Sequence, residues 1–148
     1  MENLCKLGKD NKGFDVFSII LKSEVLQAQV LSYGATLKDL RFSGFENSLV
    51  LGYRSIEDYF RDKNYVGVTV GRYANRISNG QYCLNSQKFD LDKNEVFATL
   101  HGGSNSCHNS SWEIAYFGYN FVELRYEFND GDLGFGGQLS VKLIYELA

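Results

Sequence analysis

Apolar and polar residues alternate in short runs along most of this chain, and the period of the alternation predicts β-strands. In residues 139–147 every second position is apolar, and Ile144 is the one additional apolar residue on the other face. In residues 24–32, three apolar residues alternate with two glutamines. A period of two places the apolar side chains on one face of an extended strand. The expected strands are residues 14–23, 24–32, 36–42, 48–53, 82–84, 88–91, 112–117, 121–128 and 139–147.

Short turn signals separate these runs. Asn85-Ser86 lies between two short apolar runs and predicts a β-hairpin, and Gly118-Tyr119-Asn120 separates two longer runs in the same way. Ser55, followed three residues later by Asp58, resembles a capping box, and the helical turn that it starts is expected to end by Asp62. The pattern therefore predicts an all-β fold, a sandwich of antiparallel sheets with at most one short helical turn.

The composition suits one globular domain covering residues 1–148. Hydrophobic residues make up 44% of the chain, which is far more than a disordered segment contains. The length matches one ordinary domain, and the sequence has no repeat, low-complexity tract or linker. The strand at 139–147 stops one residue before the end of the sequence. Either it lies between neighbouring strands or its natural continuation is absent, and the pattern leaves both open.

Charge and hydropathy exclude several classes of partner. Fifteen basic and eighteen acidic residues give a net charge of −3, so we expect no basic face for nucleic acid or for an anionic membrane. The apolar runs are too short to span a bilayer. Residues 1–6 lack the charged and then apolar pattern of a signal peptide. A cytoplasmic protein is the resulting expectation.

The three cysteines are Cys5, Cys83 and Cys107, an odd number with no CxxC pair. This spacing predicts neither a disulfide framework nor a zinc site, so free, partly buried thiols are expected. Cys107 precedes His108, but adjacent side chains point to opposite faces of an extended strand. We therefore do not expect a nucleophile and base at this pair.

Two segments carry polar residues that strand patterning does not explain. In residues 68–80, Arg72 and Arg76 flank Asn75 between an apolar run and a glycine turn. Guanidinium groups form forked hydrogen bonds to oxygen atoms, so a binding site is one interpretation. The alternative is that both arginines hold carboxylates or loop carbonyls.

The second segment is Leu100-His101-Gly102-Gly103, in which two glycines let the backbone approach a ligand closely. His101 can donate, accept or exchange a proton near neutral pH, although a structural histidine in a turn is an equal alternative. His108 lies in a polar stretch that is typical of a surface loop.

Other kinds of site are not indicated. The carboxylates are scattered, and no pair stands out as the acid and base of a glycosidase. Phosphate-binding loops, serine elbows and metal-binding helices are absent from the sequence. Asp130-Gly131-Asp132 lacks the further ligands of a calcium loop. We therefore expect no metal and no cofactor.

Taken together, these segments resemble the aldose 1-epimerases, also called galactose mutarotases. Any one segment is weak, but the GRxANRI and LHGG motifs at this separation are specific. The matching segments follow the family order and continue into the last strand: 32–36 (SYGAT), 49–53 (LVLGY), Tyr59, 71–77 (GRYANRI), 100–103 (LHGG), Trp112 and 130–135 (DGDLGF).

The resemblance implies a β-sandwich about twice as long as this chain, the galactose-mutarotase-like supersandwich. This chain then corresponds to the N-terminal half of the family domain. By the same resemblance Asn75, Arg76 and His101 line the sugar pocket, and Arg72 braces its loop. The implied ligand is an aldose such as galactose or glucose.

In this family a base removes the proton of the anomeric hydroxyl while an acid protonates the ring oxygen, which opens the ring for closure to the other anomer. The family's acid histidine lies in a TNHxYFN-like motif, followed by the base glutamate, and both are expected beyond Ala148. We therefore expect this chain alone to be inactive and to need a complementing C-terminal half. The alternatives are a carbohydrate-binding module without catalysis and the product of a split or decayed gene.

Overall fold

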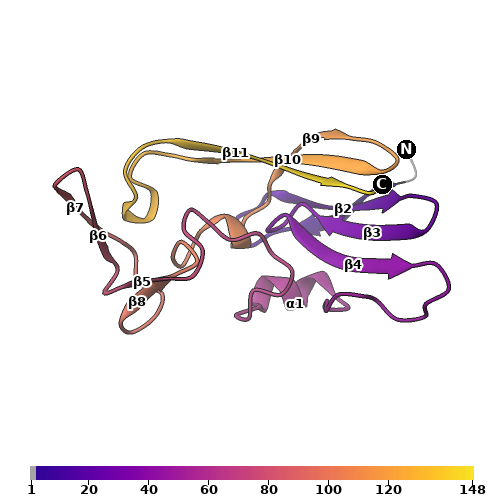
Figure 1. Ribbon diagram of the computed structural model, residues 1–148, viewed down its shortest axis with the longest axis horizontal. Coiled ribbons are helices and arrows are strands. Elements are labelled where there is room, and N and C mark those ends of the chain that lie inside the picture. Colours follow the sequence, from indigo (N-terminus) through magenta and orange to yellow (C-terminus); the bar gives the residue numbers. More distant parts are fainter. Residues whose placement is uncertain (1–2) are drawn as a thin grey trace.

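Two antiparallel sheets packed face to face form most of the structure, a computed structural model that describes residues 3–148 (Figure 1). The first sheet has the order β1-β2-β3-β4 and the second the order β11-β10-β9. Two small hairpin-like sheets, β5-β8 and β6-β7, lie at the end of the molecule away from the termini. The strands are β1 (Leu4–Lys9), β2 (Asp15–Lys22), β3 (Leu26–Leu31), β4 (Thr36–Phe42), β5 (Arg76–Ser78), β6 (Gln81–Leu84), β7 (Gln87–Asp90), β8 (Ala98–Leu100), β9 (Glu113–Phe117), β10 (Phe121–Phe128) and β11 (Leu139–Glu146). The predicted all-β antiparallel sandwich is thus confirmed.

The main core lies between the two large sheets, because alternate residues of their strands face inward. Ile19 and Val30 of the first sheet are fully buried, as are Val122 and Leu124 of the second. Trp112 closes the core next to β9, and its indole N–H donates to the Cys107 carbonyl at 2.9 Å. The alternation read from the sequence therefore corresponds to real burial.

A second, smaller core lies on the other face of the first sheet, where α1 (Ile56–Arg61) packs (Figure 1). Tyr59 of this helix is buried against residues of β2 and β3. The Ser55 hydroxyl accepts the backbone N–H of Asp58 at 3.3 Å, and Asp62 is the C-terminal cap. The predicted N-terminal cap and the predicted helix end are confirmed; the Asp58 carboxylate accepts the Ser55 hydroxyl at 2.9 Å instead of the backbone N–H that closes a full capping box. The 3₁₀ turns η1 (Cys107–Asn109) and η2 (Asp132–Gly134) complete the helical structure of the described residues.

The strand predicted at 48–53 is wrong. This segment bonds to β4 only near its start, where the N–H of Leu49 donates to the Leu40 carbonyl at 2.7 Å. No ladder continues, and Leu51 is 86% exposed. The apolar run therefore lies beside β4 but forms no ladder with it.

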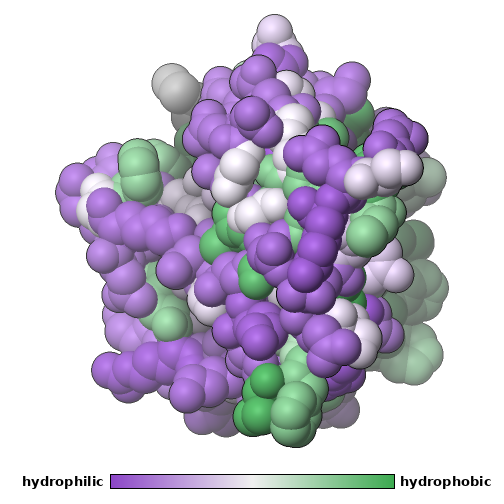
Figure 2. All heavy atoms as spheres, turned by 90° about the vertical axis from the view of Figure 1, so that its left-hand side faces the viewer, coloured by the Kyte–Doolittle hydropathy of each residue, from purple (hydrophilic) through white to green (hydrophobic). Residues whose placement is uncertain are grey.

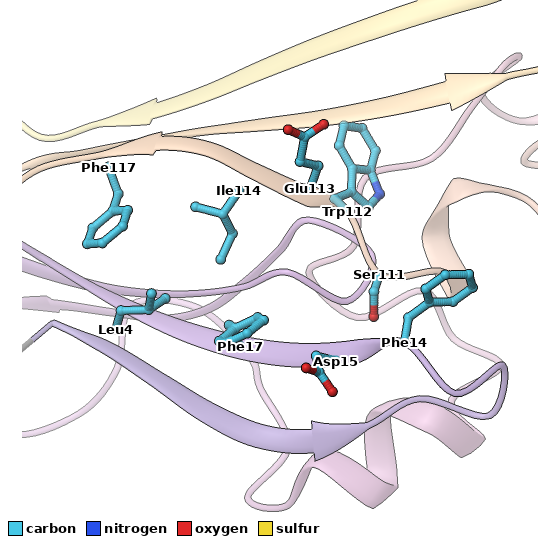
Figure 3. A pocket seen from close by; sticks show the side chains of 9 residues that line it. All are labelled: Leu4, Phe14, Asp15, Phe17, Ser111, Trp112, Glu113, Ile114 and Phe117. Atoms are coloured by element: carbon cyan, nitrogen blue, oxygen red, sulfur yellow. The ribbon is translucent and has the colours of Figure 1, made fainter.

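The last strand, β11, lies at an edge of its sheet and pairs only with β10 among the described residues. β11 therefore does not lie between two neighbouring strands of residues 3–148. A groove of about 510 Å³ opens along the opposite side of the sandwich, between β1–β2 and β9. Figure 3 shows Ile114 and Phe117 of β9 on one side of this groove and Phe17 of β2 on the other.

None of the helices in the described part of the chain has the length and apolar character that crossing a bilayer requires.

Candidate functional site

Asn75 and His101 form a closed pair at the end of the molecule where β5 meets β8. The N–H of Asn75 donates to Nδ1 of the His101 ring at 3.0 Å, and the N–H of His101 donates to the Asn75 carbonyl at 3.1 Å. The antiparallel register places Arg76 opposite Leu100, the residues that follow Asn75 and precede His101. Both residues have left-handed backbone, with φ of 74° at Asn75 and 53° at His101. The structure thus joins two sequence motifs that lie far apart in the chain.

The glycines of the second motif allow its backbone to touch the first motif. Gly102 has φ of +87°, and a Cβ atom there would collide with the Gly71 carbonyl. The hydroxyl of Ser106, which is buried, donates to the same carbonyl. Only a glycine fits at position 102, because a side chain would push the two motifs apart.

The hydrogen bond at Nδ1 determines which tautomer the neutral His101 ring adopts. Because Nδ1 accepts an N–H, the neutral ring carries its proton on Nε2. Burial, and after it the positive charge of Arg76, lowers the pKa of His101 from its usual 6.5. The ring is therefore neutral at physiological pH and offers one hydrogen-bond donor.

Arg76 is held in a fork by Glu95, a residue that the sequence did not single out. Its Nε and Nη2 each donate to a Glu95 carboxylate oxygen at 2.7 Å. The hydrogen bond and the charge of Arg76 hold the pKa of Glu95 below 4.5. One alternative reading of the sequence, an arginine bound to a carboxylate, therefore describes Arg76 in this structure. The side-chain amide oxygen of Asn75 accepts the backbone N–H of Arg76 at 2.9 Å, which links all three predicted site residues.

Arg72 makes different contacts. It donates to the carbonyls of Gly136 at 3.1 Å and Asn129 at 2.9 Å, and its guanidinium lies 5.2 Å from the ring centre of Phe128. These partners belong to β10 and the segment that follows it. This placement is that of a loop-bracing residue.

Tyr65 and His108 extend the site, although the sequence predicted His108 as part of a polar surface loop. The Tyr65 ring lies edge-on to both histidines, 4.6 Å from the ring centre of His101 and 4.9 Å from that of His108. His108 is half-buried, and burial lowers its pKa to about 4. The prediction fails because the local composition is polar, whereas burial comes from Tyr65, more than forty residues earlier in the chain.

A hollow of about 850 Å³ lies beside this aromatic group. Its lining includes Lys12, Tyr33, Asp62, Tyr65, Glu95 and His108. Figure 2 views this end of the molecule and shows a largely hydrophilic face with small, separate hydrophobic patches. Such a surface suits a ligand rich in hydroxyl groups, because side-chain donors and acceptors are available at many points.

The cysteines take no part in the site. Cys107 is buried and its pKa is raised to about 11 by burial, so the thiol stays protonated. All three cysteines are free thiols, as predicted, but Cys5 and Cys83 are exposed, so the burial that was also expected is found only at Cys107. Residues 3–148 contain no group of three or more His, Cys, Asp or Glu that is arranged to hold a metal ion.

Fold and sequence comparisons place these observations among known proteins. A family model described as aldose 1-epimerase matches residues 18–148. Galactose mutarotase of Bos taurus is 32% identical over 130 residues, covering 86% of this chain and 38% of that protein. Aldose 1-epimerase of Haemophilus influenzae is 34% identical over 124 residues, covering 82% of this chain and 36% of that protein.

Solved structures of proteins named as epimerases have a similar fold. Galactose 1-epimerase from Lactobacillus acidophilus superimposes with a TM-score of 0.84 at 28% identity, covering 98% of this chain and 44% of the other. The GalM/aldose epimerase homologue from C. elegans has a TM-score of 0.82 at 30% identity, covering 88% of this chain and 41% of the other.

The fold is therefore a galactose-mutarotase-like β-sandwich. The chain belongs to the aldose 1-epimerase family. It spans less than half the length of each of these relatives, which agrees with the predicted resemblance to the N-terminal half.

Proposed function

We propose that this chain forms the sugar-binding part of an aldose 1-epimerase that interconverts the α and β anomers of a hexose such as galactose or glucose. The observation that carries this proposal is the hydrogen-bonded cluster of Asn75, Arg76 and His101. Among the described residues, Nδ2 of Asn75, Nη1 of Arg76 and Nε2 of His101 make no hydrogen bond. Three free donors on adjoining residues suit the oxygen atoms of a pyranose.

These donors also suit the chemistry of anomer exchange. When a base removes the proton from the anomeric hydroxyl, negative charge develops on that oxygen, and fixed donors stabilise it. His101 itself is a poor acid here, because its lowered pKa leaves little protonated ring at neutral pH. We infer that the acid histidine and the base glutamate lie on polypeptide beyond Ala148, supplied as a complementing C-terminal half.

Residues 1–148 then act as one truncated domain of the family fold, and its location is proposed as the cytoplasm. Three free thiols, two of them exposed, support a reducing compartment.

Polarimetry of freshly dissolved α-galactose and α-glucose tests the proposal that the catalytic acid and base lie outside this chain. The 148-residue chain is expected to leave the rate of anomer exchange at that of buffer. A rate well above buffer that is abolished by His101→Ala would place a proton donor within this chain and would overturn the proposal.

Sugar binding is tested by NMR titration of the chain with galactose. Saturable shifts of the Arg76 and His101 signals are expected, and no shift at high galactose concentration would contradict a sugar-binding role. A carbohydrate-binding module without catalysis would give the same shifts. The coding DNA after the codon of Ala148 separates the two, because an epimerase requires a TNHxYFN-like motif there and a module does not.

A further inference from the structure

Glu95 and Arg76 form a fork at the edge of the proposed sugar site, and the fork fixes the plane of the guanidinium. Nε and Nη2 of Arg76 are both engaged at 2.7 Å, so Nη1 is the remaining edge of the group. We propose that Glu95 is a positioning residue for the sugar: it orients Arg76 so that Nη1 can bind a pyranose oxygen. This inference rests on the proposed function and goes beyond it, because it assigns a role to a residue outside the two motifs.

Stability does not account for the pair. The side chains of Arg76 and Glu95 are 57% and 33% exposed, and ion pairs this open to water contribute little to the free energy of unfolding. The same geometry strongly restricts orientation, because a planar guanidinium bound at two points cannot rotate about its long stem. The pair therefore contributes order to Arg76 more than it contributes stability to the fold.

Glu95 can restrain Arg76 only if Glu95 itself is fixed, and its loop is held at several points. The side chain of Asn94 accepts the N–H of Leu100 at 2.7 Å and donates to the Leu100 carbonyl at 2.9 Å. The same amide nitrogen lies 3.2 Å from the Tyr65 hydroxyl, and the N–H of Glu95 donates to the Ala98 carbonyl at 3.2 Å. Leu100 pairs with Arg76 in the sheet and precedes His101, so the loop is fastened to the site that it orients.

The ion pair is also open to a ligand. Arg76 and Glu95 line a groove of about 470 Å³ together with Val96 and Phe97. Val96 is 78% exposed and Phe97 is 76% exposed, so the groove combines accessible apolar side chains with the charged pair. A pyranose has both kinds of surface, since its C–H face packs on an aromatic ring while its hydroxyls bind charged groups.

Galactose titration of the full ¹⁵N-labelled chain tests the role of Glu95. The Arg76 Nε–H signal, assigned by its loss in Arg76→Lys, reports the order of the guanidinium. Glu95→Gln is expected to broaden or shift this signal before any sugar is added. It is also expected to weaken galactose binding on the order of tenfold, as loss of a charge-assisted fork predicts. The urea midpoint should remain that of the unmodified chain.

Glu123→Gln is the matched control. It removes the carboxylate of another surface ion pair, in which Nε of Arg125 donates at 2.8 Å to Glu123, a less exposed carboxylate on β10, and it should change neither galactose binding nor the Arg76 signal. Equal galactose affinity in Glu95→Gln and the unmodified chain, or an unchanged Arg76 signal, would overturn the role of Glu95.

A double-mutant cycle separates positioning from direct contact and also covers the case in which Glu95→Gln lowers the urea midpoint. If Glu95 acts through Arg76, Glu95→Gln combined with Arg76→Lys binds galactose as weakly as Arg76→Lys alone. Additive losses would contradict the proposal. Absence of binding by the unmodified chain would instead refute the proposed function, and with it any sugar role of Glu95.

Discussion

A single hydrogen bond gives His101 its chemical character. The residue types at positions 75, 76 and 101 could be chosen from the sequence, because the two motifs that contain them are specific. The bond from the Asn75 N–H to Nδ1 could not be predicted, since it needs left-handed backbone at both residues and neither is a glycine. Glu95 was missed for a related reason: it follows no motif, and only the folded loop brings it to Arg76.

The charge of Arg76 acts on the pKa of His101, and this effect can be measured directly. The pKa of His101 is expected below 6.5, with the neutral ring protonated at Nε2. Arg76→Gln should raise that pKa, because it removes a positive neighbour and leaves the Glu95 carboxylate unpaired. NMR titration of the ring nitrogens gives both values, and Arg125→Gln serves as the control that leaves His101 unchanged. A fall in the pKa on Arg76→Gln would contradict this electrostatic account.

The buried His108 predicts a loss of stability in mild acid. Its pKa is lowered to about 4 in the folded chain and is near 6.5 when unfolded. The unfolded state therefore binds more protons between these values, and the free energy of unfolding falls as pH drops from about 6.5 towards 4. Allowing for partial exposure of the ring, the loss is roughly 2 kcal/mol. Urea unfolding at several pH values measures it, and His108→Gln should flatten the dependence in this window. An equally steep dependence in that variant would assign the effect to other groups.

Among the strands, β1, β5 and β8 were not predicted from the sequence, whereas the other strands were. The predicted segments at 121–128 and 139–147 match β10 and β11 closely, because burial of one face gives the sequence a period of two. The three-residue strands β5 and β8 are too short to show that period. The segment at 48–53 has strand-like residues and lies beside β4, but it forms no ladder there, so composition alone gave a wrong prediction.

The same contrast between faces predicts unequal costs of truncation within one sheet. Leu124 on β10 is fully buried, whereas Ile144 on the neighbouring β11 is 51% exposed. Leu124→Ala should lower the free energy of unfolding by about 2–5 kcal/mol, because it removes core contacts and leaves a cavity. Ile144→Ala should cost less than about 1 kcal/mol. Urea unfolding of both variants measures the difference, and similar costs would show that the sandwich core is not packed as described.

For the molecule as a whole, the sandwich is closely packed in its centre and leaves several large apolar side chains exposed at its surface. Core side chains such as Ile19 and Leu124 are fully buried, yet large apolar side chains such as Leu51 and Phe97 are mostly exposed. The sequence predicted the fold class and the family, because both depend on local patterns and short motifs. It could not predict which apolar residues would stay exposed, since that depends on which segments have neighbours in the folded chain.

The open edge of β11 has a kinetic consequence for the proposed enzyme. An edge strand offers unpaired N–H and C=O groups along its length, and a second polypeptide can pair with them. If the catalytic acid and base lie on such a polypeptide, the rate of anomer exchange depends on how much of this chain is bound to it, and therefore on the concentrations of both.

Mixing this chain with a separately expressed C-terminal half should then give a rate of anomer exchange that rises hyperbolically with the concentration of that half. N-methylation of the alternate β11 backbone amides that point away from β10 should abolish this rise. A rate that changes neither with the concentration of the C-terminal half nor on N-methylation would rule out complementation through this edge.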